Sequence, residues 1–202
     1  MKIIEKIREH IQQLTPGEPF TAKDFRHLAT SDNIRQSLGR MVKNGEIKRI
    51  SHGVYVSPEI LPLIGETLPS AQKTAEAITK ATGETIAIHG AEAARMLQLT
   101  TQVPMQLVLY TSGNSRKLTI GNRTVTLKHV NPSKLICAGT TAGIVISALS
   151  YLGKANVTIE VINKISKQLP SNEFQFIIKQ INHMPIWMAD LFFNFQQGSK
   201  DD

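Results

Sequence analysis

Residues 21–57 read TAKDFRHLATSDNIRQSLGRMVKNGEIKRISHGVYVS, and this stretch decides the fold of the amino-terminal part of the chain. From about residue 32 to residue 43 its apolar residues recur at helical spacing, at Ile34, Leu38, Met41 and Val42. Ser31 or Asp32 can cap the start of this predicted helix, and Asn44-Gly45 supplies a left-handed stop at its end. The opposite face of the helix then carries Asp32, Gln36, Gly39, Arg40 and Lys43.

The segments on either side complete the pattern of a winged helix-turn-helix. Upstream, Thr21 caps a short predicted helix over residues 22–28, with Asp24 at the capping-box position. Downstream, residues 46–50 and 54–56 predict a β-hairpin with a basic first arm. A helix with Gln, Arg and Lys on its outer face, followed at once by such a hairpin, is typical of this DNA-binding fold.

The outer face of the second helix supplies the predicted DNA contacts. Reading bases in the major groove requires long side chains with several donors, so we expect Gln36 and Arg40 to read bases. Arg35 and Lys43 are expected on phosphates, and Asn33 on a phosphate or a base. Further phosphate contacts are predicted on the hairpin, at Lys48, Arg49 and His52. The alternative for all of them is a solvated surface, which most exposed Lys and Arg residues form.

The rest of the chain predicts an α+β protein in which the winged helix-turn-helix, residues 1–57, precedes a larger α/β domain. Residues 58–69 are apolar but punctuated by Pro and Gly, and we expect them to form a packed connector. Residues 70–202 form the second domain, which ends in a helical bundle. The spacing of its apolar residues predicts a mixed sheet at residues 85–130 and helices at residues 141–193.

Composition narrows the classes of function. The 202 residues are 41% hydrophobic, which favours a folded core over disorder. The net charge is +7, and residues 1–57, with ten Lys and Arg against six Asp and Glu, carry +4 of it. A basic balance favours a nucleic-acid partner. With a single cysteine, no leader and no apolar run of about 20 residues, we expect a soluble cytoplasmic protein that does not contact a membrane.

Candidate catalytic residues lack partners in the sequence. His89-Gly90 joins a predicted strand to a helix, where a general base or an anion site is one interpretation. No carboxylate or second His stands at a supporting spacing, so we favour a structural corner. Cys137 lies in a short apolar run and is expected to be a buried small side chain. We therefore predict no enzymatic activity, no metal and no cofactor.

Aromatic residues gather near the carboxyl end of the chain, at Trp187, Phe192, Phe193 and Phe195. Two interpretations are open. The aromatic side chains can seal the core of the second domain, which we favour. Alternatively, they can form an exposed patch for a protein partner, because aromatic residues are enriched in such interfaces.

The motifs at residues 33–47 and 52–55 resemble the winged helix of AbiE-type antitoxins, which belong to type IV toxin–antitoxin systems. Residues 88–94 and 101–104 resemble the second domain of a branch of that family. The resemblance implies an autoregulating antitoxin that represses its own operon through inverted repeats in double-stranded DNA. It also implies opposition to a nucleotidyltransferase-like toxin without a stable complex. Two copies on a pseudo-palindrome would form a homodimer on the DNA.

The sequence departs from this family at two positions. His52 stands where the family often has Arg, which weakens a contact at the tip of the hairpin or makes it pH-sensitive. Gly39 stands where a small polar residue is more usual, and it permits close approach of another backbone.

Two other functions are alternatives. A protein-interaction adaptor built on a winged helix, without DNA binding, would need apolar anchors on the outer face of residues 32–43, and that face has none. A nucleic-acid-modifying enzyme would need a metal or nucleotide site within residues 84–140.

Overall fold

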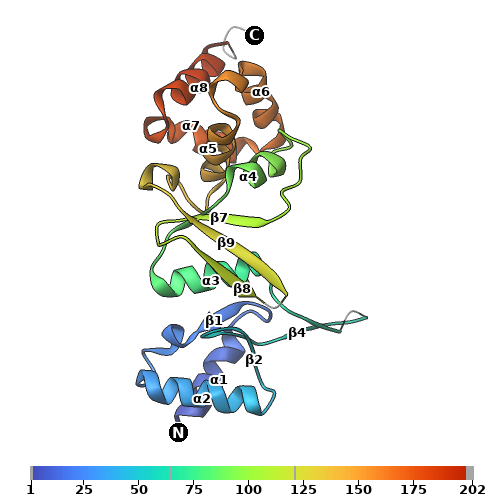
Figure 1. Ribbon diagram of the computed structural model, residues 1–202, viewed down its shortest axis with the longest axis vertical. Helices are drawn as coiled ribbons and strands as arrows, with labels where there is room; N and C mark the ends of the chain where they lie inside the picture. The colour runs from blue at the N-terminus through green and yellow to red at the C-terminus, as the bar shows by residue number, and fades with distance from the viewer. Residues whose placement is uncertain (1, 64, 121, 199–202) are drawn as a thin grey trace. The chain divides into compact units, whose positions relative to one another are not determined.

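The computed structural model describes residues 2–63, 65–120 and 122–198, and it combines helices with three small sheets (Figure 1). The predicted α+β class is confirmed at this level. The chain divides into two compact units. The first comprises residues 1–84 with 117–125, and the second comprises residues 85–116 with 126–202. The predicted boundary at residues 58–69 therefore falls inside the first unit.

The first unit begins with a helical core and a three-stranded antiparallel sheet in the order β1-β3-β2. Its elements are α1 (Ile3–Gln13), β1 (Pro19–Thr21), the 3₁₀ helix η1 (Ala22–Phe25), α2 (Ser31–Lys43), β2 (Lys48–Ser51) and β3 (Val54–Val56). They are followed by β4 (Glu59–Leu61), β5 (Gly65–Thr67) and α3 (Ala71–Thr82).

Three of the four residues in the predicted apolar stripe of α2 are buried, and the fourth, Val42, is partly buried. Ile34, Leu38 and Met41 are at most 1% exposed and pack with residues of α1 and of the following sheet. Gly45 ends the helix with φ +74°, in the left-handed region. The start differs by one residue, because the N-cap is Thr30 and neither Ser31 nor Asp32 caps the helix.

The predicted helix over residues 22–28 is shorter in the structure. Thr21 does cap it, and its backbone N–H donates to the Asp24 carboxylate at 2.7 Å. The 3₁₀ helix ends at Phe25, however, with Arg26 as its C-cap. Beyond Phe25 the segment offers only the partly buried Leu28 as an apolar anchor, which is too little to stabilise a longer helix.

A salt bridge between Arg8 and Glu46 joins α1 to the turn after α2. The Arg8 Nε and Nη2 atoms donate to the two Glu46 carboxylate oxygens at 2.8 and 3.1 Å. This hydrogen-bonded pair lowers the pKa of Glu46 from its ordinary value. The forked geometry fixes the turn that leads into β2.

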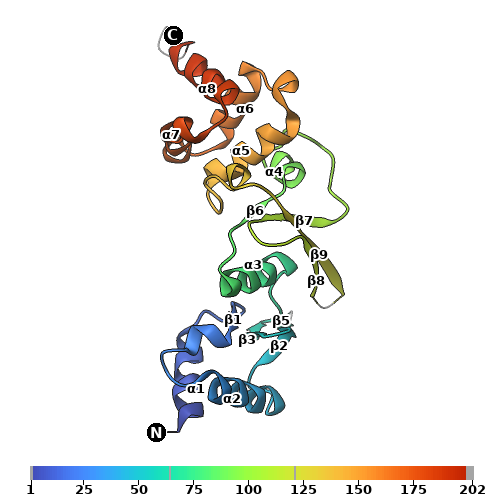
Figure 2. The same cartoon turned by 60° about the vertical axis from the view of Figure 1, so that its left-hand side comes forward.

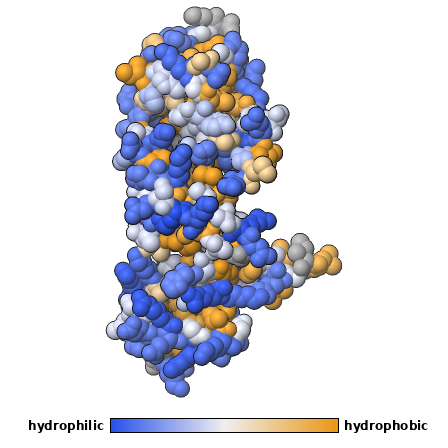
Figure 3. Space-filling view, viewed as in Figure 1, coloured by the Kyte–Doolittle hydropathy of each residue, from blue (hydrophilic) through white to orange (hydrophobic). Residues whose placement is uncertain are grey.

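The segment predicted as a packed connector is instead an exposed two-stranded hairpin. Strands β4 and β5 pair only with each other in the described chain, with Ile60 opposite Glu66. Ile60 is 80% exposed and Leu63 is fully exposed, and Figure 3 shows hydrophobic side chains on this projecting hairpin. The prediction of burial is wrong here, because the Pro-punctuated sequence turns back on itself and does not lie across the core.

The second unit contains strands and helices close to the predicted positions. A four-stranded sheet has the order β6-β7-β9-β8, and part of its β8–β9 hairpin falls within the first unit. Its strands are β6 (Ile86–Ile88), β7 (Leu107–Thr111), β8 (Arg116–Ile120) and β9 (Arg123–His129). The sequence pair Gly121-Asn122 predicts a tight turn between β8 and β9, and position 121 lies outside the described residues. Short 3₁₀ helices follow at η2 (Pro132–Lys134), η3 (Lys154–Asn156) and η4 (Ile181–His183).

The helices of the second unit are α4 (Gly90–Met96), α5 (Thr141–Leu152), α6 (Ile159–Gln168), α7 (Ser171–Lys179) and α8 (Ile186–Gly198). They share one hydrophobic core, in which α4 and α7 pack against α5 and α6 packs against α8. Phe192 is fully buried in their core, and Trp187 and Phe195 pack against it while only partly buried. Phe193 is 56% exposed. The core interpretation of the terminal aromatic residues is therefore confirmed for Trp187, Phe192 and Phe195. It is wrong for Phe193.

None of the described helices combines the length and the apolar character that a membrane crossing requires.

Candidate nucleic-acid interface

The outer face of α2 exposes every residue predicted there to contact DNA. Asn33, Arg35, Gln36, Arg40 and Lys43 are all exposed, because the buried stripe holds the opposite side of the helix in the core. Sequence reasoning missed Ser37, which is buried and donates its hydroxyl to the Asn33 carbonyl at 2.8 Å. Its place three residues after Ile34 was the signal for burial.

The cations on this face differ in how free they are. Arg35 Nη1 lies 3.7 Å from Asp32 Oδ1, and both side chains are largely exposed. Such a solvated pair contributes little. Among the described residues no side chain bonds or pairs with Gln36, Arg40 or Lys43. Their donors are therefore available to a ligand.

Gly39 lies in the middle of the exposed face. A Cβ atom built on it would meet nothing within 4 Å, so the packing of the chain does not require glycine there. The position costs about 1 kcal/mol of helix stability relative to Ala. It also leaves the backbone of α2 uncovered between Gln36 and Arg40.

On the hairpin β2–β3, unlike on α2, the basic side chains already have partners within the chain. Lys48 and Arg49 are both exposed on β2, which is an edge strand of the sheet. Lys48 Nζ lies 2.6 Å from a carboxylate oxygen of Glu66 on β5. Glu66 is 18 residues further along the chain, and no local pattern in the sequence indicates this pairing.

The tip of the hairpin is organised around Arg49. Its Nε donates to the Ser51 carbonyl at 3.3 Å, and its Nη2 lies 2.9 Å from His52 Nδ1. A guanidinium only donates, so His52 accepts through Nδ1 in this contact. Tyr55 on β3 is buried and stacks on Phe20 with ring centroids 6.2 Å apart.

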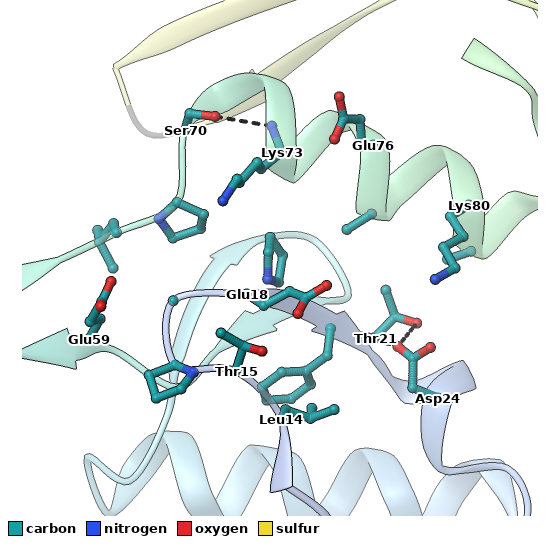
Figure 4. Close-up of a pocket in the computed structure, with 18 of the residues that line it drawn as sticks. Leu14, Thr15, Glu18, Thr21, Asp24, Glu59, Ser70, Lys73, Glu76 and Lys80 are labelled. Carbon is teal, nitrogen blue, oxygen red and sulfur yellow. Dashed lines mark hydrogen bonds between the residues drawn. The ribbon is translucent and has the colours of Figure 1, made fainter. Parts of the chain in front are cut away.

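A cleft of about 1000 Å³ also lies in the first unit, between α3 and the segment from the end of α1 to η1 (Figure 4). Its charged lining mixes both signs, with Lys73, Glu76 and Lys80 on α3 and Glu18 and Asp24 across from them. Lys23 donates to the Ala81 carbonyl oxygen beside the cleft. A surface of alternating sign does not match a polyanion, so we place the candidate interface on α2 and the hairpin.

The candidate catalytic residues have structural partners. His89 caps α4, and its Nδ1 accepts from the Ala91 backbone N–H at 3.2 Å. Burial, together with the charges of Lys128 and Lys134, lowers the pKa of His89. The partly buried Cys137 contacts the Gln180 side chain, and burial raises the pKa of its thiol. Among the described residues, no group of three or more His, Cys, Asp or Glu side chains is placed to hold a metal.

The sequence of residues 6–176 matches a family described as "Family of unknown function (DUF6088)". The chain belongs to this family. The matched region begins within α1 and ends within α7, so the family includes α2, the hairpin and most of the second unit. No curated protein matches the chain.

Proposed function

We propose that this DUF6088 protein is a DNA-binding transcriptional regulator that uses α2 as its recognition helix. The observation that carries the proposal is the outer face of α2, where Gln36, Arg40 and Lys43 are exposed and without side-chain partners in the described chain. These residues provide the donors that base edges and phosphates accept.

The elements around α2 support a winged helix-turn-helix. Helix α1, the short η1 and α2 precede β2 and β3, and β1 joins these two strands in one sheet. In this arrangement the second helix of the pair enters the major groove and the hairpin lies beside the backbone. We propose that Gln36 and Arg40 read bases and that Arg35, Lys43 and Asn33 contact the flanking backbone or bases.

The hairpin contributes less to the proposed affinity. Lys48 must leave Glu66 before it can contact a phosphate, and Arg49 is shared with His52 and the Ser51 carbonyl. Each existing contact must be replaced when DNA binds, so the net gain per cation is smaller than on α2.

We further propose, from the resemblance to AbiE-type antitoxins, that the regulator represses its own operon. Two copies would bind an inverted repeat whose half-sites are separated by one helical turn or by multiples of it. The antitoxin would oppose a nucleotidyltransferase-like toxin without forming a stable complex with it. A nucleotidyltransferase gene next to this one would support the proposal.

A mobility-shift assay with random duplex DNA at low salt tests DNA binding directly. With a duplex that contains the upstream inverted repeat, we expect Arg40→Ala to weaken binding by about tenfold, because an Arg contact to a base is worth about 1–3 kcal/mol. Lys6→Ala is the matched control, since Lys6 is an exposed cation on α1. Equal affinity of the parent, Arg40→Ala and Lys6→Ala proteins would contradict the assignment of α2.

One observation favours a second candidate, a protein-interaction adaptor. Hairpin β4–β5 exposes Ile60 and Leu63, and exposed apolar side chains mark protein contacts. An Ile60→Ser, Leu63→Ser double variant separates the two functions. A regulator that binds through α2 keeps its affinity for duplex DNA in this variant, whereas an adaptor shows no duplex binding with or without the substitutions.

A further inference from the structure

The cleft of about 1000 Å³ beside α3 lies within the first unit, and none of the residues proposed to contact DNA lines it. One wall is α3, which lies beside β1 and contacts it (Figure 2). The other wall is the segment from the end of α1 to η1. Its volume falls at the upper end of the range of about 300–1,000 Å³ that is usual for small-ligand sites. The cleft is therefore large enough for a ligand of several residues.

Contacts within the chain hold the sides of the cleft in place. Lys23 on η1 donates its ammonium to the Ala81 carbonyl oxygen near the end of α3. The Gly17 N–H, in the turn after α1, donates to the Ser57 carbonyl oxygen at 2.9 Å, just before β4. Glu59 lies against the same turn, since a Cβ atom built on Gly17 would be 3.3 Å from Glu59 Oε2. The cleft is thus formed in the free chain, which reduces the cost of ordering it around a ligand.

Charged side chains of both signs line the cleft, three lysines and four acids in all. Asp24 and Glu76 accept hydrogen bonds from neighbouring residues, and Lys23 donates one to α3. The side chains of the other four have no hydrogen bond or ion pair within the described part of the chain, namely Glu18, Glu59, Lys73 and Lys80. All four are exposed, so a ligand in the cleft can pair with them.

The four unpaired charges are spread along the length of the cleft. Lys73 and Lys80 are two helical turns apart on one face of α3, a rise of about 10.5 Å along the helix axis. Glu59 lies at the end of the cleft nearer Lys73, and Lys80 lies at the other end, beside Asp24 (Figure 4). The carboxylate of Asp24 is already bonded to Thr21. The cleft therefore has an unpaired carboxylate at one end and an unpaired ammonium at the other.

We propose that this cleft binds a short zwitterionic peptide in extended form. The amino terminus of the peptide pairs with Glu59, and its carboxylate pairs with Lys80. Glu18 and Lys73, between the ends, accept from and donate to the peptide backbone. An extended chain rises about 3.3 Å per residue, so about three or four residues span the two turns of α3. A polyanion would meet the acids of the lining, and an apolar ligand would leave its charges unpaired.

The full chain can be titrated by calorimetry with four probes, which are trialanine, N-acetyl-trialanine, trialanine amide and free alanine. We expect saturable binding of trialanine. Acetylation removes the charged amino terminus and amidation removes the carboxylate, so each derivative should bind about tenfold more weakly through the loss of a charged hydrogen bond. Free alanine carries both charges but cannot reach both ends of the cleft, and it should also bind more weakly than trialanine.

Matched variants assign each end of the peptide to its partner. Lys80→Met should weaken the binding of trialanine by about tenfold but leave that of the amide unchanged, because the amide has no carboxylate to lose. Glu59→Gln should weaken the binding of trialanine but not that of the acetylated peptide. Both residues are exposed, so folding should not change. Lys6→Met and Glu9→Gln remove exposed charges of α1 outside the cleft and should have no effect.

The absence of saturable trialanine binding up to about 10 mM, a very weak affinity, would overturn the proposal. Equal affinities of trialanine and its two blocked derivatives would overturn it too, as would equal losses in Lys6→Met and Lys80→Met. Arg40→Ala should retain trialanine binding, because Arg40 does not line the cleft. Failure of the duplex-binding proposal and failure of this one are therefore distinguishable.

Discussion

Helices α2 and α5 are almost equal in length, with 13 and 12 residues, but they use their surfaces in opposite ways. Helix α2 buries four residues in one stripe and exposes Arg35, Arg40 and Lys43 on the other side. Helix α5 contains no charged residue, and Ala142, Gly143 and all five residues from Val145 to Leu149 are buried.

Helix α5 therefore holds the core of the second unit together, whereas α2 exposes one face to solvent. The sides of α5 are occupied by α4, α7 and the residues before it, and little of it is left for a partner. The single stripe of α2 is enough to dock it, so its other face is available for recognition. We expect substitutions in the two helices to affect different properties.

The largest expected effect is on stability, in α5. Leu149→Ala removes a fully buried side chain and should lower the free energy of unfolding by about 2–5 kcal/mol. Urea denaturation measures the loss. The affinity for duplex DNA, normalised to the folded fraction, should not change. A folded Leu149→Ala protein that no longer binds duplex would show that the comparison between the helices is wrong.

A substitution on the exposed face of α2 should raise stability and can lower the affinity for duplex DNA. Gly39→Ala meets no atoms of the chain and should stabilise the protein by about 1 kcal/mol, because Ala is the better helix former. Thermal unfolding checks the gain. If DNA approaches the backbone at this position, the same substitution weakens duplex binding. A gain in stability without any loss of affinity would remove Gly39 from the interface.

The hairpin offers a test of smaller size. Glu66→Ala releases Lys48 from its ion pair, and we expect duplex affinity at low salt to rise by about threefold, as suits an exposed pair worth under about 1 kcal/mol. Fluorescence anisotropy with labelled duplex resolves this change. Glu59→Ala on the same hairpin is the control for the loss of an acid. An equal gain in both variants would indicate a general charge effect.

The smallest expected effect is the pH dependence of the second unit. The pKa of His89 is lowered by burial and by Lys128 and Lys134, so the unfolded chain binds a proton more readily than the folded one. Stability should therefore fall as the pH drops from neutral through the ordinary range of histidine. His89→Asn retains an N-cap and should abolish this dependence in denaturation curves between pH 5 and 8. A curve that keeps its slope in the variant would assign it to another group.

The local pattern in the sequence predicts α2 well. Its stripe, its Gly45 stop and its exposed face follow from the helical period, because each depends on residues within a few turns of one another. Strands β7, β8 and β9 all lie within residues 85–130, where the sequence predicts a mixed sheet. The exposure of each polar side chain on α2 follows from how far around the helix it lies from the buried stripe.

Features that depend on distant residues are not predictable in this way. The apolar composition of residues 58–69 indicated burial, but pairing between β4 and β5 exposes Ile60 and Leu63. The ion pair between Lys48 and Glu66 and the contact of Gly90 with α5 join segments far apart in the chain. The contact of His89 with Tyr110 depends on the pairing of β6 with β7, which the sequence pattern does not specify.

The most direct test of the central claim is the salt dependence of duplex binding by the parent chain and by an Arg40→Ala, Lys43→Ala double variant. Each cation that neutralises a phosphate contributes about 0.9 to the slope of log K against log salt concentration. We predict tight, steeply salt-dependent binding by the parent, and a weaker affinity with a slope smaller by about 1–2 in the variant. Identical affinity and slope for the two proteins at every salt concentration would contradict the assignment of α2 as the recognition helix.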